Sequence, residues 1–173
     1  RSDSGYDCII SVSGGKDSMR LAMYARDKLG LTPLLVSTMI PPEMVSDVGM
    51  KNIDNLNKLG FDIITVEPDP VTYKKLMKLA LIKFGNYVKA TEVVLYVSAP
   101  KVALAYGIKM ILLGENGNLV YGDIVSKNDG GDASDMIDTN TLDSGDISWM
   151  QDDNIQLNDL FPYQYPTKKN ILD

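Results

Sequence analysis

Residues 13–18 have the sequence Ser13-Gly14-Gly15-Lys16-Asp17-Ser18, between an apolar run at 6–12 and a helical pattern at 19–29. Two glycines remove the Cβ atoms that would keep backbone N–H groups away from an anion. The start of a helix adds unpaired N–H donors and the positive end of the helix dipole. Lys16 contributes a full positive charge, and the two serines contribute hydroxyl donors. A strand, a glycine turn and a helix start therefore predict a phosphate-binding loop.

The spacing of this loop separates it from the commonest phosphate loop. A Walker A loop needs a glycine, four further residues, then Gly-Lys followed by Ser or Thr. Here Asp17 follows Gly15-Lys16, and Ile10 stands where the first glycine would be, which disfavours a kinase-like or GTPase-like loop. The motif resembles the pyrophosphate loop of the ATP pyrophosphatase superfamily, which cleaves ATP between the α and β phosphates. The alternative is a tight strand-to-helix turn with a serine cap and no ligand.

Length and composition fit one ordinary globular domain. The chain has 173 residues, of which 45% are apolar and 23% charged. No apolar run approaches the roughly 20 residues that span a bilayer, so we expect no membrane insertion. The single cysteine, Cys8, cannot form an internal disulfide, which favours a cytoplasmic protein. The sequence contains no histidine, and this excludes His-based catalysis and His-ligated metal within it.

The net charge of −6 is unevenly distributed. Residues 1–127 contain 15 Lys and Arg against 13 Asp and Glu, whereas residues 128–159 contain nine Asp and no basic residue. The first part is near neutral and lacks the basic face of a nucleic-acid-binding protein. We therefore expect no nucleic acid partner.

Strand and helix patterns alternate along the first 125 residues. Strands are predicted at 32–40, 61–66 and 109–113 besides the first at 6–12, and helices at about 47–59, 70–84 and 100–106. Residues 87–98 are rich in valine and fit either a strand or a helix. Strands joined by helices pair in parallel, so the fold class is α/β with a doubly wound, mostly parallel sheet. The loops at 13–18 and 114–117 then both lie at carboxyl ends of strands, where such sheets bind ligands.

Apolar residues recur at helical spacing in two of these helices. In the helix at 47–59 they are Met50, Ile53, Leu56 and Leu59, and in the helix at 70–84 the candidates for the buried side are Val71, Tyr73, Leu76, Leu79 and Ala80.

Three segments follow from this pattern: an ATP-binding α/β domain at 1–127, an acidic irregular loop at 128–159, and an aromatic segment at 160–173 that packs on the core. Asp129, Asp132, Asp135 and Asp138 recur every three residues but lack the ligand spacing of an EF-hand. A solvated acidic loop is therefore the favoured interpretation, with Trp149 and Met150 as its anchor.

The wider pattern resembles one family of that superfamily, the N-acetyl sugar amidotransferases of bacterial surface-polysaccharide (lipopolysaccharide) biosynthesis. The matching pieces are residues 6–18, Leu59-Gly60-Phe61-Asp62, Pro68-Asp69-Pro70 with Tyr73, Phe84-Gly85, Ile111 to Asn116 with Tyr121-Gly122, and Pro162-Tyr163-Gln164-Tyr165-Pro166. The resemblance implies an adenine nucleotide alpha hydrolase-like (HUP-type) fold. Members of the family also carry cysteine-bearing segments that look metal-binding. This sequence lacks them, so we expect an incomplete or diverged member.

What the resemblance implies about the site can be placed on particular residues. ATP and Mg²⁺ would be the cofactors, bound by Ser13, Gly14, Gly15, Lys16, Asp17 and Ser18 together with Val36, Ser37, Thr38 and Gly114. Ser18 is expected to cap the helix and touch phosphate, and Asp17 either binds Mg²⁺ or only fixes the loop. Lys16, Asp17, Glu115 and Asn116 would be the catalytic residues. Lys101 either contacts the α phosphate or the sugar nucleotide or is only a solvated helix lysine.

The implied reaction adenylates the acetamido carbonyl of a UDP-linked sugar, and ammonia from a separate glutaminase then displaces AMP. A homo-oligomer stays an open alternative for the assembly. Two other functions also stay open: a tRNA-modifying thiolase of the same superfamily, and a nucleotide-binding module without turnover. A thiolase would need sulfur-carrying cysteines and a basic RNA-facing surface, neither of which this sequence offers.

Overall fold

A computed structural model describes residues 2–41, 47–114, 133–139 and 141–172. The chain divides into two compact units. Unit 1 consists of residues 1–67 and 98–115, and unit 2 of residues 68–97 and 116–173. The expected domain boundary at residue 127 lies outside the described residues and stays a prediction.

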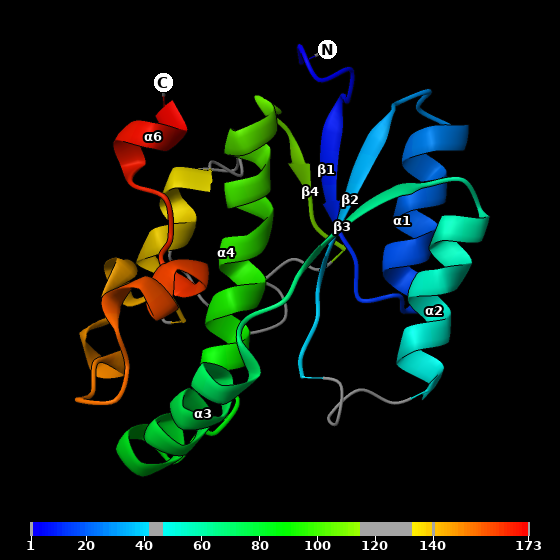
Figure 1. Cartoon of the computed structure of the whole chain (residues 1–173). Helices are drawn as coiled ribbons and strands as arrows, with labels where there is room; N and C mark the ends of the chain where they lie inside the picture. Colours follow the sequence, from blue (N-terminus) through cyan, green and yellow to red (C-terminus); the bar gives the residue numbers. More distant parts are fainter. Residues whose placement is uncertain (1, 42–46, 115–132, 140, 173) are drawn as a thin grey trace. The chain divides into compact units, whose positions relative to one another are not determined.

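Unit 1 contains a four-stranded sheet of entirely parallel pairs (Figure 1). Its strands are β1 (Cys8–Ser11), β2 (Pro33–Thr38), β3 (Asp62–Val66) and β4 (Ile111–Leu112), in the order β3-β2-β1-β4. All four fall inside the predicted strand ranges, although β4 has only two residues. The strand order runs outward in both directions from β1, which is the arrangement of a doubly wound sheet.

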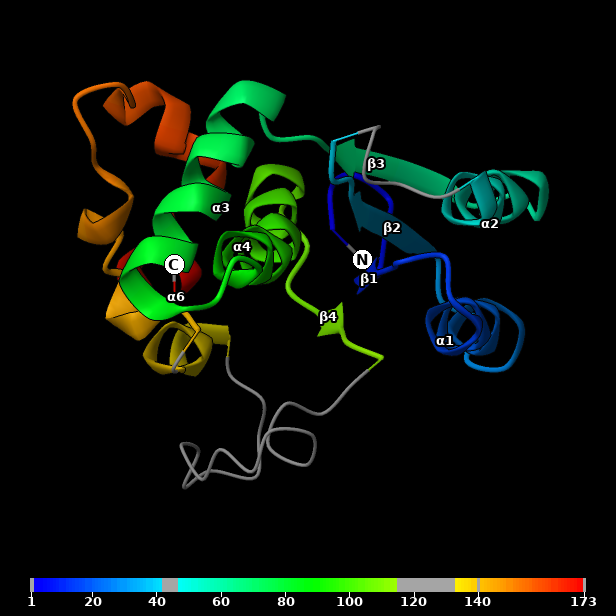
Figure 2. The same cartoon turned by 90° about the horizontal axis from the view of Figure 1, so that it is seen from below.

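Apolar side chains of alternate strand residues cover both faces of this sheet. On one face Cys8, Ile10 and Leu35 pack with helices α1 (Lys16–Asp27) and α2 (Asp47–Lys58), which lie on the same side of the strands in Figures 1 and 2. On the other face Ile9 and Val36 pack with the part of helix α4 (Lys89–Tyr106) that belongs to unit 1. Helices on both faces confirm the predicted fold class.

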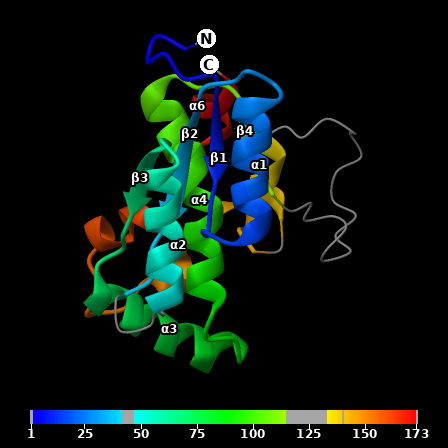
Figure 3. The same ribbon diagram turned by 90° about the vertical axis from the view of Figure 1, so that its right-hand side faces the viewer.

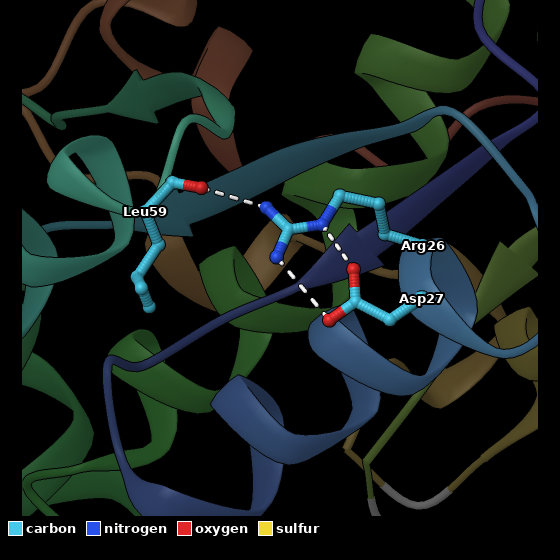
Figure 4. A network of polar contacts seen from close by, with 3 residues as sticks. All are labelled: Arg26, Asp27 and Leu59. Atoms are coloured by element: carbon cyan, nitrogen blue, oxygen red, sulfur yellow. Dashed lines mark hydrogen bonds and ion pairs between the residues drawn. The ribbon is translucent and has the colours of Figure 1, made fainter.

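A polar network joins the end of α1 to the end of α2 (Figure 4). Arg26 Nη1 donates to the carbonyl oxygen of Leu59 over 2.6 Å, and its Nε donates to Asp27 Oδ1 over 2.7 Å. The guanidinium also lies 4.3 Å from the centre of the Phe61 ring. These contacts fix the turn between α2 and β3 against α1.

The apolar residues at helical spacing along α2 are not all buried. Leu56 is fully buried and Ile53 packs against the core, but Met50 and Leu59, which lies just past the helix end, are exposed.

Unit 2 is built on helix α3 (Pro70–Phe84) and the first part of helix α4 (Lys89–Tyr106). Asp69 caps α3, where its carboxylate accepts from Thr72 N over 2.7 Å, and Gly85 ends it with φ +66°. The buried side of α3 includes Tyr73, Leu76 and Ala80 as predicted, whereas Val71 is 61% exposed. The ambiguous stretch 87–98 is largely helical, since α4 runs unbroken through Pro100 (Figure 3).

The acidic part of unit 2 forms short turns rather than regular elements. They are η2 (Ala133–Asp138), η3 (Asp143–Gly145), η4 (Ser148–Met150) and η5 (Leu157–Tyr163), followed by α6 (Lys168–Leu172). Trp149 and Met150 are buried in a core shared with α3 and α4, so the predicted anchor is confirmed. This packing orders the described part of the acidic segment, where the Asp side chains are exposed: Asp138, Asp143, Asp146, Asp152, Asp153 and Asp159. No helix in the described ranges is long and apolar enough to cross a membrane.

Candidate phosphate-binding site

The predicted phosphate loop joins β1 to α1 at the carboxyl edge of the sheet. Val12 N donates to Val36 O over 2.9 Å and so extends the pairing of β1 with β2 beyond Ser11. The chain then turns through Ser13 and reaches Gly14, which has φ +78°. Gly15 is extended, with φ −71° and ψ 165°, and leads directly into α1. The sequence therefore forms the strand, glycine turn and helix start that the motif predicts.

The start of α1 has no side-chain cap. Gly15 occupies the N-cap position, so the prediction that Ser18 caps the helix is wrong. Ser18 Oγ instead donates to Gly15 O over 3.1 Å, and Ser13 Oγ accepts weakly from Gly15 N over 3.4 Å. A helix without a cap leaves the N–H groups of its first turn available to an anion.

The two charged residues of the loop are both exposed. Lys16 is the first residue of α1, and Asp17 is the acidic residue of its first turn. A carboxylate beside bound phosphates matches the usual way in which proteins hold Mg²⁺, with one or two carboxylates and the substrate phosphates. Asp17 therefore fits the expected metal. The described residues contain no group of three acidic or cysteine side chains that would form a metal site of its own.

The end of β2 lies next to this loop in the sheet. Val36 and Ser37 are buried, with Val36 in the core under the sheet, while Thr38 is half-buried. Of these three predicted nucleotide contacts, Thr38 has the side chain most open to solvent. Val36 reaches the loop through its carbonyl oxygen, which accepts from Val12.

The loop after β4 meets the start of α1. A Cβ built on Gly114 would lie 3.9 Å from both N and Cα of Ser18. The structure therefore brings together the two loops that the sequence placed at strand ends. Glu115 and Asn116, the other predicted residues of this loop, lie outside the described residues and stay predictions.

One contact of the loop was not predicted from the sequence. A Cβ on Gly14 would lie 2.8 Å from Asn52 Cβ and 3.2 Å from Ile53 Cδ1, so α2 closes against the glycine turn. No local pattern in the sequence signals this contact, because α2 reaches the loop only through the fold of unit 1.

Lys101 of α4 lies in unit 1 and has an unusual environment. Burial lowers the pKa of its ammonium from 10.5 to about 8. Cys8, in contrast, is fully buried in β1, where burial raises the pKa of the thiol and removes it from contact with solvent. A sulfur-transfer role for Cys8 does not fit this position.

Unit 2 brings two of the resembling motifs together. Tyr73, which follows Pro68-Asp69-Pro70, bonds through its hydroxyl to Thr91 Oγ1. Tyr163, from the late aromatic motif, is 1% exposed, and its hydroxyl has no hydrogen-bond partner among the described residues. Burial first, then the nearby Tyr73 and Asp69, raise the pKa of Tyr163. The hydroxyl groups of Tyr73 and Tyr163, one from each motif, therefore lie near each other in the core of unit 2.

Comparison with known proteins gives limited similarity. No protein-family model and no curated protein matches the sequence. One similar solved structure is a predicted subunit of tRNA methyltransferase from Methanocaldococcus jannaschii, with 22% identity and a TM-score of 0.41. The match covers 71% of this chain and 57% of the tRNA methyltransferase subunit, so this chain spans little more than half of the length of that subunit. Similarity at this level leaves the function to be argued from the residues of the chain itself.

Proposed function

We propose that unit 1 binds the phosphate tail of ATP and that the chain belongs to the ATP pyrophosphatase superfamily, forming AMP and pyrophosphate. The observation that carries the proposal is the uncapped start of α1, which follows a glycine turn at the carboxyl edge of a parallel sheet. The N–H groups of the first turn and the positive end of the helix dipole suit an anion there, and Lys16 is the first residue of the same helix. The motif resemblance assigns that anion to the β and γ phosphates.

The chemistry we propose is activation of an acetamido carbonyl of a nucleotide sugar. The carbonyl oxygen attacks the α phosphorus of ATP, the bond to the bridging oxygen of the β phosphate breaks, and pyrophosphate leaves. Ammonia from a separate glutaminase then adds to the activated carbon, and the C–O bond breaks to release AMP and an amidine. Attaching AMP turns a poor leaving group, hydroxide, whose conjugate acid is the very weak acid water, into a phosphate with a pKa near 6.

The residues of the loop act on the first of these steps. Lys16 and the N–H groups of the first turn of α1 stabilise the negative charge that develops on the departing pyrophosphate. Gly14 and Gly15 let the backbone approach the phosphates. Mg²⁺, held by Asp17 and the phosphates, would screen the remaining charge. Glu115 and Asn116 would orient the sugar or the metal from the loop after β4.

Titration calorimetry with ATP and with pyrophosphate tests the binding step. We expect both to bind, and Lys16→Ala to lower their affinity at least tenfold. The matched control is Lys28→Ala, which removes an exposed lysine just past the far end of α1 and should change affinity less than twofold. Equal binding by both variants and the wild type would place the phosphates elsewhere.

Product analysis tests the reaction. The chain is incubated with ATP, Mg²⁺, ammonia and UDP-linked acetamido sugars, and the nucleotide products are separated. AMP with pyrophosphate supports the proposal, whereas ADP with orthophosphate contradicts it. Tight ATP binding without turnover would favour the nucleotide-binding module instead.

A further inference from the structure

Helix α2 forms a wall of the phosphate loop. A Cβ on Gly14 would lie 2.8 Å from Asn52 Cβ and 3.3 Å from the Asn52 carbonyl carbon. Real Cβ atoms do not approach one another this closely, so the glycine is needed for α2 to reach the loop. Asn52 and Ile53 are the side chains that make this contact.

The position of Asn52 is fixed by the core below it. Leu56, one turn further along α2, is fully buried, and Ile53 packs against the same cluster of β1, β2 and α1 residues. Asn52 itself is half-buried, because it lies at the edge of this packed face. Its side chain is therefore held beside the loop without being enclosed in the core.

Asn52 is the polar member of the pair that touches Gly14. A side-chain amide carries two N–H donors and no charge, which suits contact with a phosphate oxygen. Hydrogen bonds from neutral donors to charged acceptors are stronger than those between neutral groups. The two residues on either side offer other chemistry, since Lys51 is exposed and Ile53 is apolar.

We propose that Asn52 is a phosphate-contact residue and that its amide donates to the phosphate tail that occupies the loop at residues 13–18. This inference rests on the proposed function, because it names a further residue of the same site. It assigns α2 a binding role that neither the motif nor its spacing indicates. The phosphate tail then lies between two helices, with the start of α1 on one side and Asn52 on the other.

Three variants test this assignment with pyrophosphate as the probe. Asn52→Asp keeps the shape of the side chain but places a negative charge beside the phosphate, and we expect at least a tenfold loss of affinity. Asn52→Ala keeps the Cβ that packs on Gly14 and should lose about three- to tenfold. Asn57→Asp adds the same charge to an exposed position of the same helix and should stay within twofold of the wild type.

A pH titration separates contact with the ligand from a structural role. Protonation of the new carboxyl turns it back into a neutral donor, so the deficit of Asn52→Asp relative to the wild type should shrink between pH 7 and pH 4.5. Thermal unfolding midpoints of all variants are measured alongside. A loss of stability would lower affinity at both pH values and would not be relieved by acid.

The outcomes distinguish this inference from the proposed function. If Asn52→Asp and Asn52→Ala bind pyrophosphate within twofold of the wild type while Lys16→Ala does not, Asn52 is not a phosphate contact and the loop assignment stands. If the wild type binds neither pyrophosphate nor ATP, the proposed function is wrong and the inference falls with it. If Asn52→Asp does not fold, an unchanged affinity in Asn52→Ala overturns the inference alone.

Discussion

Replacing Gly14 with alanine tests the geometry on which the phosphate site depends. The residue has φ +78°, a conformation that costs an L-amino acid about 1–2 kcal/mol. The new methyl group would also meet Asn52 Cβ at 2.8 Å and Ile53 Cδ1 at 3.2 Å. Forcing an extra methyl into a packed contact costs about 1–3 kcal/mol. We therefore expect Gly14→Ala to lower the free energy of unfolding by about 2–5 kcal/mol.

Gly30→Ala is the matched control. Gly30 has φ +65°, but a Cβ there would meet no atom within 4 Å. Its substitution should cost only the backbone strain, about 1–2 kcal/mol. The difference between the two variants, about 1–3 kcal/mol, then measures the contact between the loop and α2.

The assay is urea denaturation followed by far-ultraviolet circular dichroism, with hydrogen exchange of peptides from β1 and β2. Exchange in these strands reports on unit 1 by itself and does not depend on how unit 2 unfolds. Both variants should exchange faster than the wild type, and Gly14→Ala should exchange faster than Gly30→Ala. If the two variants were equally stable, α2 would not close on the loop as described.

Three further substitutions have expected outcomes that can be measured by the same denaturation method. Tyr163→Phe removes a buried hydroxyl that has no hydrogen-bond partner among the described residues, and it should stabilise the protein by about 1 kcal/mol, whereas the exposed Tyr87→Phe should change little. Destabilisation by Tyr163→Phe would mean that the hydroxyl is bonded. The stability of Lys101→Met relative to the wild type should fall as the pH rises from about 8 towards 10, because the folded wild type then loses its proton before the unfolded chain does and gains stability. A constant difference across this range would contradict the lowered pKa. Met150→Ala should lower the free energy of unfolding by about 2–5 kcal/mol, since this side chain is fully buried, while the exposed Met50→Ala should lower it by less than about 1 kcal/mol. Equal effects would mean that Met150 does not anchor the acidic segment.

Local patterns predicted the fold well where neighbouring residues determine the structure. The strand before Ser13, the turn at Gly14 and the full extent of α3 follow from apolar runs, glycine and an Asp-Pro helix start. The parallel pairing of the strands follows from the helices that join them. These features need no knowledge of distant contacts.

The stretch 87–98 shows where residue preferences mislead. Its valines favour strand, but Ala90, Val93, Val94 and Val97 are all buried and recur at helical spacing. The spacing is the stronger signal, and it predicts the helix that the structure contains. At Val71 it is the helical spacing that misleads. The spacing indicates which side of a helix faces the core, but not how far around the helix the buried residues extend.

The candidate site was predicted only in part. The loop residues and Gly114 come together as expected, because all lie at carboxyl ends of neighbouring strands. The contact of Asn52 with Gly14 was not predicted, because it arises from the docking of α2 through Leu56 on the sheet. The roles of Lys16, Asp17, Glu115 and Asn116 stay predictions until binding is measured.

The order of the segments along the chain has a consequence during protein synthesis. Unit 1 is interrupted, since its sequence leaves at residue 67 and returns at residue 98, and Gly114 reaches Ser18 only then. A ribosome that adds about 5–20 residues per second needs roughly 5–20 s for the stretch of about a hundred residues from Ser18 to Gly114. During that interval the nascent chain contains the glycine turn and α1 without the final strand of the sheet. The proposed phosphate site is therefore completed late in synthesis, only after residues 68–97, the first stretch of unit 2, have been added to the chain.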